Sequence, residues 1–257
     1  MGYIHRLVVT TKGINMVSYA VTLLSGGLDS STVTALAKNE VSNLTALTFH
    51  YGQSHSKEID CAKAISKSLK VEHTLLDISF IEKISWYSAL TNPEKFPIPT
   101  NSENNQIGFN IPITYVPLRN TIFISLAASL LESNILNSIE INGANPDDVE
   151  AIIYMAPNFI DYSGYPDCRP EFYEQISKAI NQGSKIYTEY GIPFNIKTPI
   201  IDFTKADIAK LAYKLSVPLE KTWSCYRGTD KPCQECDSCI LRAKGFKEAN
   251  LIDPLCE

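Results

Sequence analysis

The feature that most constrains the fold is a short unit near the N-terminus that reads as a strand, a glycine turn and a helix start. Residues 19–24 form an apolar run typical of a buried strand. Residues 25–31, Ser-Gly-Gly-Leu-Asp-Ser-Ser, follow, and their two glycines permit a tight turn and close approach of the backbone to a ligand. A helical pattern then continues to Lys38, so unpaired N–H groups and the positive end of the helix dipole face the turn. This unit favours an α/β protein that binds an anion.

The same unit has a purely structural interpretation, in which Asp29 or Ser30 caps the helix. A carboxylate suits an anion site only if it holds a cation such as Mg2+ between itself and a phosphate. For Ser-Gly-Gly alone the structural interpretation is preferable. For the whole strand–turn–helix unit we favour the phosphate site.

The turn lacks the lysine of the Walker pattern. It resembles the loop of the PP-loop ATP pyrophosphatases, which implies adenylation of a substrate oxygen with release of pyrophosphate. That superfamily is broad, so the motif indicates the activation chemistry and leaves the substrate open. The resemblance makes the following residues candidate ATP contacts: Leu24, Ser25, Gly26, Gly27, Leu28, Asp29, Ser30 and Ser31.

Composition limits the class of partner. The 257 residues carry a formal net charge of -5, which argues against a broad nucleic-acid surface. No apolar stretch of membrane-spanning length and no secretory signal is evident, so we expect a cytoplasmic protein. Residues 1–15 precede a natural start at Met16 and are expected to lie outside the core.

The rest of the chain alternates strand and helix patterns, which predicts a doubly wound parallel sheet whose ligands lie at the carboxyl ends of its strands. The expected strands are 19–24, 44–51, 71–76 and 138–143. The expected helices are 56–69, 120–131, 170–190 and one opened by a capping box at 204–207. Residues 91–112 and 144–169 are expected to be long loops. We assign 16–216 to the ATP-binding domain and 217–257 to a small C-terminal region.

Four of the seven cysteines lie close together in that region, at Cys225, Cys233, Cys236 and Cys239. In a cytoplasmic chain, cysteines separated by two intervening residues favour metal binding over disulfides. Four thiolates suit tetrahedral Zn2+ and leave no open position, so the metal would be structural. An iron–sulfur cluster is the second choice. Four unrelated buried thiols would not explain the repeated spacing.

Three further stretches narrow the resemblance: Tyr-Gly-Gln-Ser-His-Ser-Lys-Glu at 51–58, Val-Pro-Leu-Arg-Asn at 116–120 and Asp-Tyr-Ser-Gly-Tyr-Pro-Asp-Cys-Arg-Pro-Glu-Phe at 161–172. With Cys-Ile-Leu-Arg-Ala-Lys-Gly-Phe at 239–246, they resemble the 7-cyano-7-deazaguanine synthase family. The resemblance implies conversion of 7-carboxy-7-deazaguanine, ammonia and ATP to the nitrile, through a carboxyl adenylate and an amide. It also implies a zinc site and a homodimer.

The same resemblance suggests residue roles. Asp29 and Arg119 are the catalytic candidates. Asn120 is a candidate substrate contact. The remaining substrate candidates are Asp161 and Asp167 for the N–H groups of a guanine-like edge, Tyr165 for stacking on the ring, and Arg169 for the carboxylate. The 161–172 loop is expected to lie near Ser25, because it follows the strand 138–143. We assign no role to His50, His55 or His73.

Departures from the family pattern keep alternatives open. Leu118 and Gln234 stand where the family commonly has glycine, and 146–158 looks like an insertion. The chain could therefore be a paralogue that stops at the amide or ligates another amine, including one on a protein. A tRNA-modifying or RNA-binding zinc protein is a third hypothesis, and the acidic charge counts against it.

Overall fold

A five-stranded parallel sheet with strand order β3-β2-β1-β4-β5 forms the centre of the protein. The computed structural model describes residues 16–52, 57–99, 111–158, 164–227 and 229–255. The strands are β1 (Val17–Leu23), β2 (Asn43–His50), β3 (Glu72–Asp77), β4 (Val149–Tyr154) and β5 (Phe194–Lys197). The predicted α/β class and parallel sheet are confirmed.

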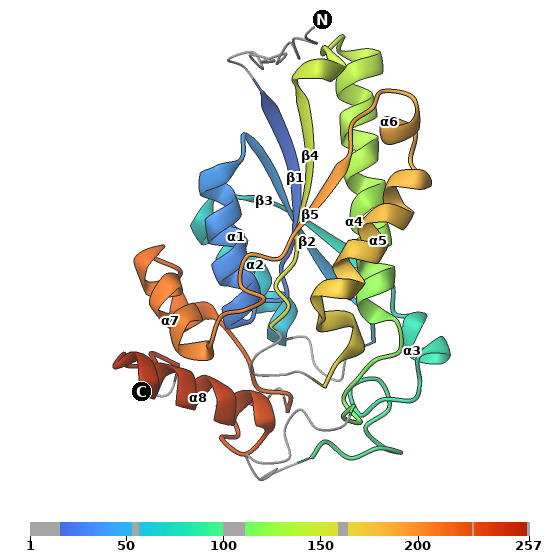
Figure 1. Cartoon of the computed structure of the whole chain (residues 1–257). Coiled ribbons are helices and arrows are strands. Elements are labelled where there is room, and N and C mark those ends of the chain that lie inside the picture. The colour runs from blue at the N-terminus through green and yellow to red at the C-terminus, as the bar shows by residue number, and fades with distance from the viewer. Residues whose placement is uncertain (1–15, 53–56, 100–110, 159–163, 228, 256–257) are drawn as a thin grey trace, which may run out of the picture.

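Helices cover both faces of this sheet (Figure 1). One layer contains α1 (Leu28–Glu40), α2 (Lys57–Leu69), α7 (Lys205–Lys214) and α8 (Asp237–Ala249). The other contains α4 (Arg119–Leu136), α5 (Pro170–Gln182) and α6 (Lys185–Thr188). The short α3 (Ile81–Ile84) lies on the side of this second layer, and its Ile81 is buried in the same core as Ile124 of α4. Successive strand residues point to opposite faces. Ala20 and Ile152 therefore pack with the first layer, whereas Val21 and Ile153 pack with the second. The sheet is doubly wound, as predicted.

Two predictions about the middle of the chain are wrong. Residues 138–143 are not a strand, because α4 continues into a π-helical turn at Asn137–Ile141. Ile135 and Ile139 lie one turn apart and pack in the same core, which favours the helix over the alternating pattern. The segment 146–158, expected to be an inserted loop, contains β4, which pairs with both β1 and β5. β4 is apolar because helices pack on both faces of the sheet and bury its side chains.

The region after β4 also differs from expectation. The predicted helix 170–190 is two helices, since α5 ends at Gln182, with Gly183 as its C-cap, and α6 starts at Lys185. The short edge strand β5 was not predicted. The capping box of α7 is confirmed, because the Thr204 side chain accepts a hydrogen bond from the Asp207 N–H, and the Asp207 carboxylate accepts one from the Thr204 N–H.

One helix contradicts the expectation that no segment reaches membrane-spanning length. Residues Arg119–Ile141 are long and apolar enough to cross a membrane, by length and composition only. In this fold the helix packs on the sheet, where Ile124, Ala127 and Leu131 are buried in the core. The core helix of an α/β domain meets the same criterion, so the finding is weak evidence for a membrane.

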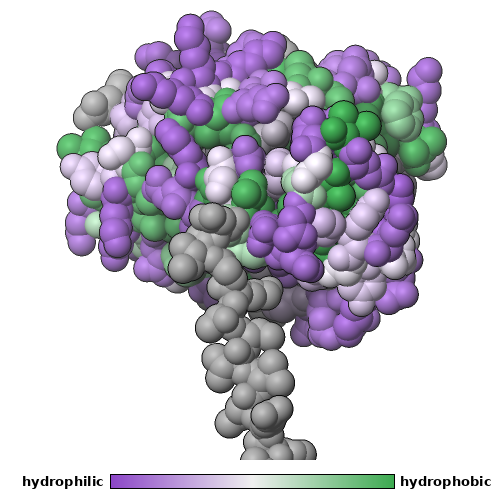
Figure 2. Space-filling view, turned by 90° about the horizontal axis from the view of Figure 1, so that it is seen from above, coloured by the Kyte–Doolittle hydropathy of each residue, from purple (hydrophilic) through white to green (hydrophobic). Residues whose placement is uncertain are grey.

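The C-terminal region shares the core of the first helical layer. Phe246 and Ala249 of α8 belong to the same buried cluster as Ala209 and Ala212 of α7. Helix α8 lies against α7 at the end of the molecule where the strands finish (Figure 1). At the opposite end hydrophilic side chains cover most of the surface, and the hydrophobic ones form small separate groups (Figure 2). The domain boundary at 216 stays a prediction, and the extension 1–15 lies outside the described residues.

Candidate active site

A cavity of about 350 Å³ lies at the carboxyl ends of the central strands. This is where ligands bind in open α/β sheets. Leu24 at the end of β1, Thr48 and Phe49 of β2, and Met155 after β4 contribute to its wall. Residues from α1, α2, α4, α5, α7 and α8 also line it. The cavity therefore combines segments that are far apart in the sequence.

The 25–31 turn contributes to this cavity directly. Leu24, Ser25, Gly27, Leu28, Asp29 and Ser30 line it. The Ser25 and Ser30 hydroxyls are 2.9 Å apart, and the Ser31 hydroxyl donates to the Gly27 carbonyl at 2.6 Å. Helix α1 has Gly27 as its N-cap and no side-chain cap. Neither Asp29 nor Ser30 is the capping residue, so the purely structural interpretation is not supported. Gly26 and Ser31 belong to the turn but are not among the residues that line the cavity.

Gly26 allows the turn to lie against the first turn of α2. Its φ of +85° is in the left-handed region, and a Cβ built on it would lie 2.3 Å from the Glu58 carbonyl oxygen. We expect Gly26→Ala to destabilise the fold by at least about 1–2 kcal/mol, the cost of the left-handed conformation alone. Displacement of the turn from α2 should also weaken ATP binding. Thermal unfolding and ATP titration measure the two effects.

Gly143→Ala is the matched control for this variant. Gly143 also has a positive φ, of +74°, but nothing lies within 4 Å of the added Cβ. It should therefore lose some stability and keep ATP affinity. Equal ATP affinity in the two variants would contradict the role given to the Gly26 contact.

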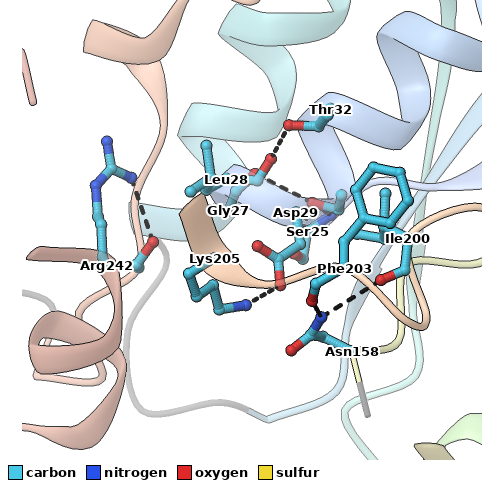
Figure 3. Close-up of polar contacts among 12 residues, drawn as sticks. Ser25, Gly27, Leu28, Asp29, Thr32, Asn158, Ile200, Phe203, Lys205 and Arg242 are labelled. Atoms are coloured by element: carbon cyan, nitrogen blue, oxygen red, sulfur yellow. Dashed lines mark hydrogen bonds and ion pairs between the residues drawn. The ribbon is translucent and has the colours of Figure 1, made fainter. Parts of the chain in front are cut away.

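Asp29 and Lys205 form an ion pair at the cavity wall. The Lys205 Nζ donates to the Asp29 Oδ2 at 2.5 Å, and the two side chains are 17% and 25% exposed (Figure 3). Gly245 of α8 holds the start of α7 close, because an added Cβ there would lie 2.5 Å from the Lys205 Cβ. Sequence reasoning missed Lys205. The available signal was its place in the first turn of the helix that the capping box at 204–207 predicts.

Arg119 and Asn120 begin α4 beside the cavity, and both line it. The preceding Leu118 has φ 55°, a conformation that favours glycine, and its side chain is exposed. The Asn120 N–H donates to the Asp167 Oδ2 at 3.3 Å, and the Asn120 Nδ2 donates to the Asp167 carbonyl at 3.0 Å. Asp167 thus links the 164–169 segment to the start of α4.

The four remaining substrate candidates occupy different environments. Tyr165 lines the cavity, and its hydroxyl lies 2.7 Å from that of Thr114. Asp167 is buried behind the cavity wall, where desolvation raises the pKa of its carboxyl group. Arg169 is exposed and does not line the cavity. Asp161 lies outside the described residues.

The expected proximity of Tyr165 and Ser25 is present, because both residues line one cavity. The strand that leads to the Tyr165 segment is β4, however, and not the predicted strand at 138–143. β4 lies directly beside β1 in the sheet.

Sequence reasoning also missed Glu58, Trp223 and Arg242, which line the cavity from α2, the loop before the cysteines and α8. His50 and His73, to which no role was assigned, lie outside its wall; His50 is 3.5 Å from Asp77, and His73 lies 2.8 Å from the Thr48 hydroxyl. His55 lies outside the described residues.

The four predicted cysteines form a metal-binding cluster. The Sγ atoms of Cys225, Cys233, Cys236 and Cys239 lie within 4.8 Å of one another. A tetrahedral site with metal–sulfur bonds of about 2.3 Å needs sulfurs about 3.8 Å apart, so small movements would close the shell. Backbone N–H groups point to the sulfurs, including those of Arg227 and Cys233 toward the Cys225 Sγ, at 3.4 Å each. The site is enclosed by protein, which suits a structural metal.

The parallel sheet, the turn at Ser25 and the four-cysteine cluster define an α/β nucleotide-binding protein with a metal site. Residues 19–250 match the family described as "Queuosine biosynthesis protein QueC". The match covers most of the chain, and the chain belongs to this family.

Two relatives are both named 7-cyano-7-deazaguanine synthase. The protein from Thermoplasma volcanium is 45% identical over 238 residues, which cover 92% of this chain and 89% of the relative. The protein from Syntrophus aciditrophicus is 44% identical over 238 residues, covering 91% and 95%. Among solved structures, a "predicted subunit of tRNA methyltransferase" from Methanocaldococcus jannaschii aligns with 94% of this chain and 93% of its own, at a TM-score of 0.44 and 16% identity. That level of similarity supports no statement about function.

Proposed function

We propose that this protein is an ATP-dependent ligase that converts 7-carboxy-7-deazaguanine and ammonia to 7-cyano-7-deazaguanine. The observation that carries the proposal is the single cavity that contains the Ser25–Ser30 turn, Lys205, Arg119 and Tyr165. Relatives that are 45% and 44% identical to the chain carry the name of this synthase. The membership of the family supports the same reaction.

The cavity suits the activation of a carboxylate. The turn and the N-terminus of α1 would hold the phosphates of ATP, because N–H groups and the helix dipole favour anions. The substrate carboxylate oxygen would attack the α-phosphorus from roughly 3–3.5 Å. The bond to pyrophosphate breaks as the new bond forms. A carboxylate otherwise has no good leaving group, and AMP supplies one.

The positive groups in the cavity have separate roles in this proposal. Lys205 lies next to the turn and would contact the phosphates. Arg119 would bind the substrate carboxylate or the α-phosphate, since its planar guanidinium suits bidentate contacts. Tyr165 would stack on the purine-like ring. The roles of Asn120, Asp161, Asp167 and Arg169 as substrate contacts stay predictions.

Two metals are part of the proposal. The Asp29 carboxylate lines the cavity and already pairs with a cation, the Lys205 ammonium, so its position fits a magnesium ion shared with the phosphates. That ion would offset charge on the leaving pyrophosphate. We assign Zn2+ to the cysteine cluster, with an iron–sulfur cluster as the alternative.

The test is incubation with carboxy-deazaguanine, ammonium and ATP, followed by mass analysis of all products. We expect AMP, pyrophosphate and the nitrile, with one ATP cleaved for each of the two activations. Substrate-dependent ADP and phosphate as the nucleotide products would contradict the proposal. An amide that accumulates without nitrile would favour the paralogue that stops at this step.

The assembly and location of the protein belong to the same proposal. We propose a cytoplasmic homodimer that acts on small molecules. The RNA-binding alternative has less support, because a net charge of -5 does not favour phosphate backbones. Sedimentation of the purified protein tests the dimer.

A further inference from the structure

Glu58 is a carboxylic acid in the active-site cavity that has no role in the proposal above. It lies in the first turn of α2 and lines the same cavity as Ser25 and Arg119. Its backbone carbonyl lies against Gly26, which places this turn of α2 next to the phosphate-binding turn. The contact therefore fixes where the Glu58 side chain enters the cavity.

The carboxylate is held in a way that suits proton transfer. No described residue donates a hydrogen bond to it. Desolvation raises the pKa of Glu58 to about 7, and the nearby charge of Arg119 opposes this rise. A general base is most effective when its pKa is near the working pH. The Glu58 side chain lines the cavity, and Arg119 lines it as well.

The other ionisable groups around the cavity are less suited to accept a proton. Lysine and arginine carry no acceptor when charged, and Asp29 is paired with Lys205. Desolvation raises the pKa of the Cys168 thiol to about 12, so this thiol is protonated at neutral pH. The groups that share the cavity with Glu58 are Tyr51 after β2, Arg119 of α4, Tyr165 and Cys168 before α5, Tyr173 of α5, Asp29 of α1, Lys205 of α7, Tyr226, and Arg242 of α8.

We propose, on the basis of the proposed function, that Glu58 accepts the proton that the attacking nitrogen loses when the amide C–N bond forms. The lone pair of ammonia attacks the carboxyl carbon of the adenylate and forms the C–N bond. The bond from that carbon to the AMP oxygen breaks, and its electron pair leaves with AMP. One proton passes from nitrogen to the Glu58 carboxylate, which later releases it to water. The products are the amide, AMP and one proton.

The experiment measures two steps separately in the variant Glu58→Gln: adenylation of the carboxylate and attack on the adenylate by ammonia. Glutamine keeps the shape of the side chain and cannot take the proton. We expect carboxylate-dependent exchange of pyrophosphate into ATP to be retained. Amide formation from ammonia at pH 7 should fall by about 100-fold or more, the usual contribution of a general base. Hydroxylamine, a stronger nucleophile, should still trap the adenylate. Glu72→Gln, an exposed change of equal charge on β3, is the matched control.

The pH profile and a second variant give independent readouts. At constant free ammonia, the rate of amide formation should rise with pH through about 7 and then level, as Glu58 loses its proton. Glu58→Gln should lack this rise. Added formate should restore amide formation in Glu58→Ala and leave Glu58→Gln unchanged, because only the alanine variant has room for a small carboxylate.

Three results would overturn the inference about Glu58. Glu58→Gln could form the amide at the unmodified rate, or lose pyrophosphate exchange together with amide formation. Formate could also fail to act on a folded Glu58→Ala that still adenylates. Absence of exchange in the unmodified protein is a different outcome, because it would contradict the proposed function itself.

Discussion

Asp29→Ala is expected to lower the rate of AMP formation by about 100–1,000-fold, the loss seen when one group that stabilises a transition-state charge is removed. The carboxylate would hold the cation that offsets negative charge on the leaving pyrophosphate. Its loss also leaves Lys205 without the partner at 2.5 Å that orients it. Asp29→Asn should be similarly impaired, since the amide keeps the size and loses the charge. AMP release under saturating substrates measures the effect.

The fold should survive this change. Asp29 lies at the cavity surface, where its side chain is 25% exposed, and it is not part of the hydrophobic core. Glu174→Ala is the control, because it removes an exposed carboxylate 2.6 Å from Lys178, away from the cavity. It should leave both activity and the unfolding temperature unchanged. Near-normal AMP formation by Asp29→Ala would refute the assignment.

Cys236→Ser is expected to remove both the metal and most of the stability of the C-terminal region. Structural zinc contributes on the order of 10 kcal/mol or more to folding in small zinc domains, whereas whole domains are stable by only about 5–15 kcal/mol. Loss of one of four thiolates should therefore lower metal content from about one ion per chain to near zero and reduce the unfolding temperature sharply. Metal analysis and thermal unfolding, with and without a chelator, measure these effects.

Cys61→Ala is the matched control for the cysteine variant. Cys61 packs against the cluster without being one of its four members. It should keep the metal and most of the stability. Reduced, folded and active unmodified protein with no bound metal would disprove the metal assignment. An unchanged unfolding temperature in Cys236→Ser would argue against a structural role.

Local patterns predicted most of the first half of the fold. The 19–24 strand, the turn and the start of α1 were predictable, because apolar runs, glycines and helix starts are short-range signals. The same holds for the cysteine cluster, whose spacing alone predicts ligands close in space. In both cases the residues that matter are neighbours in the chain.

The strand β4 was missed because its environment is set by long-range packing. β4 pairs with β1 on one side and β5 on the other, and its side chains are buried in the cores on both faces of the sheet. Its residues therefore lack the alternation of apolar and polar side chains that identifies a strand. The predicted strand at 138–143 had that alternation and is helical, because Ile135 and Ile139 pack one turn apart in the core.

The cavity as a whole was only partly predictable. Glu58, Lys205 and Arg242 come from separate helices that meet only after the sheet has formed. No motif joins them, since their proximity follows from strand order and helix packing. The 25–31 turn was enough to predict the position of the site. The other cavity residues, such as Glu58, Lys205 and Arg242, are brought together only by the fold.

The order of the strands has a consequence for the protein while it is being made on the ribosome. β1 leaves the ribosome first but needs β4 on one side, and the cavity over its end needs Lys205 and Arg242 from the last part of the chain. Chains elongate at about 5–20 residues per second, so the nucleotide-binding turn waits roughly 10–40 seconds for Lys205 and Arg242 to be made. During that time the unpaired edge of β1 is exposed to aggregation. Translation stalled before β4 should therefore give a chain that binds a chaperone, and translation stalled before α8 should give one that does not yet bind ATP.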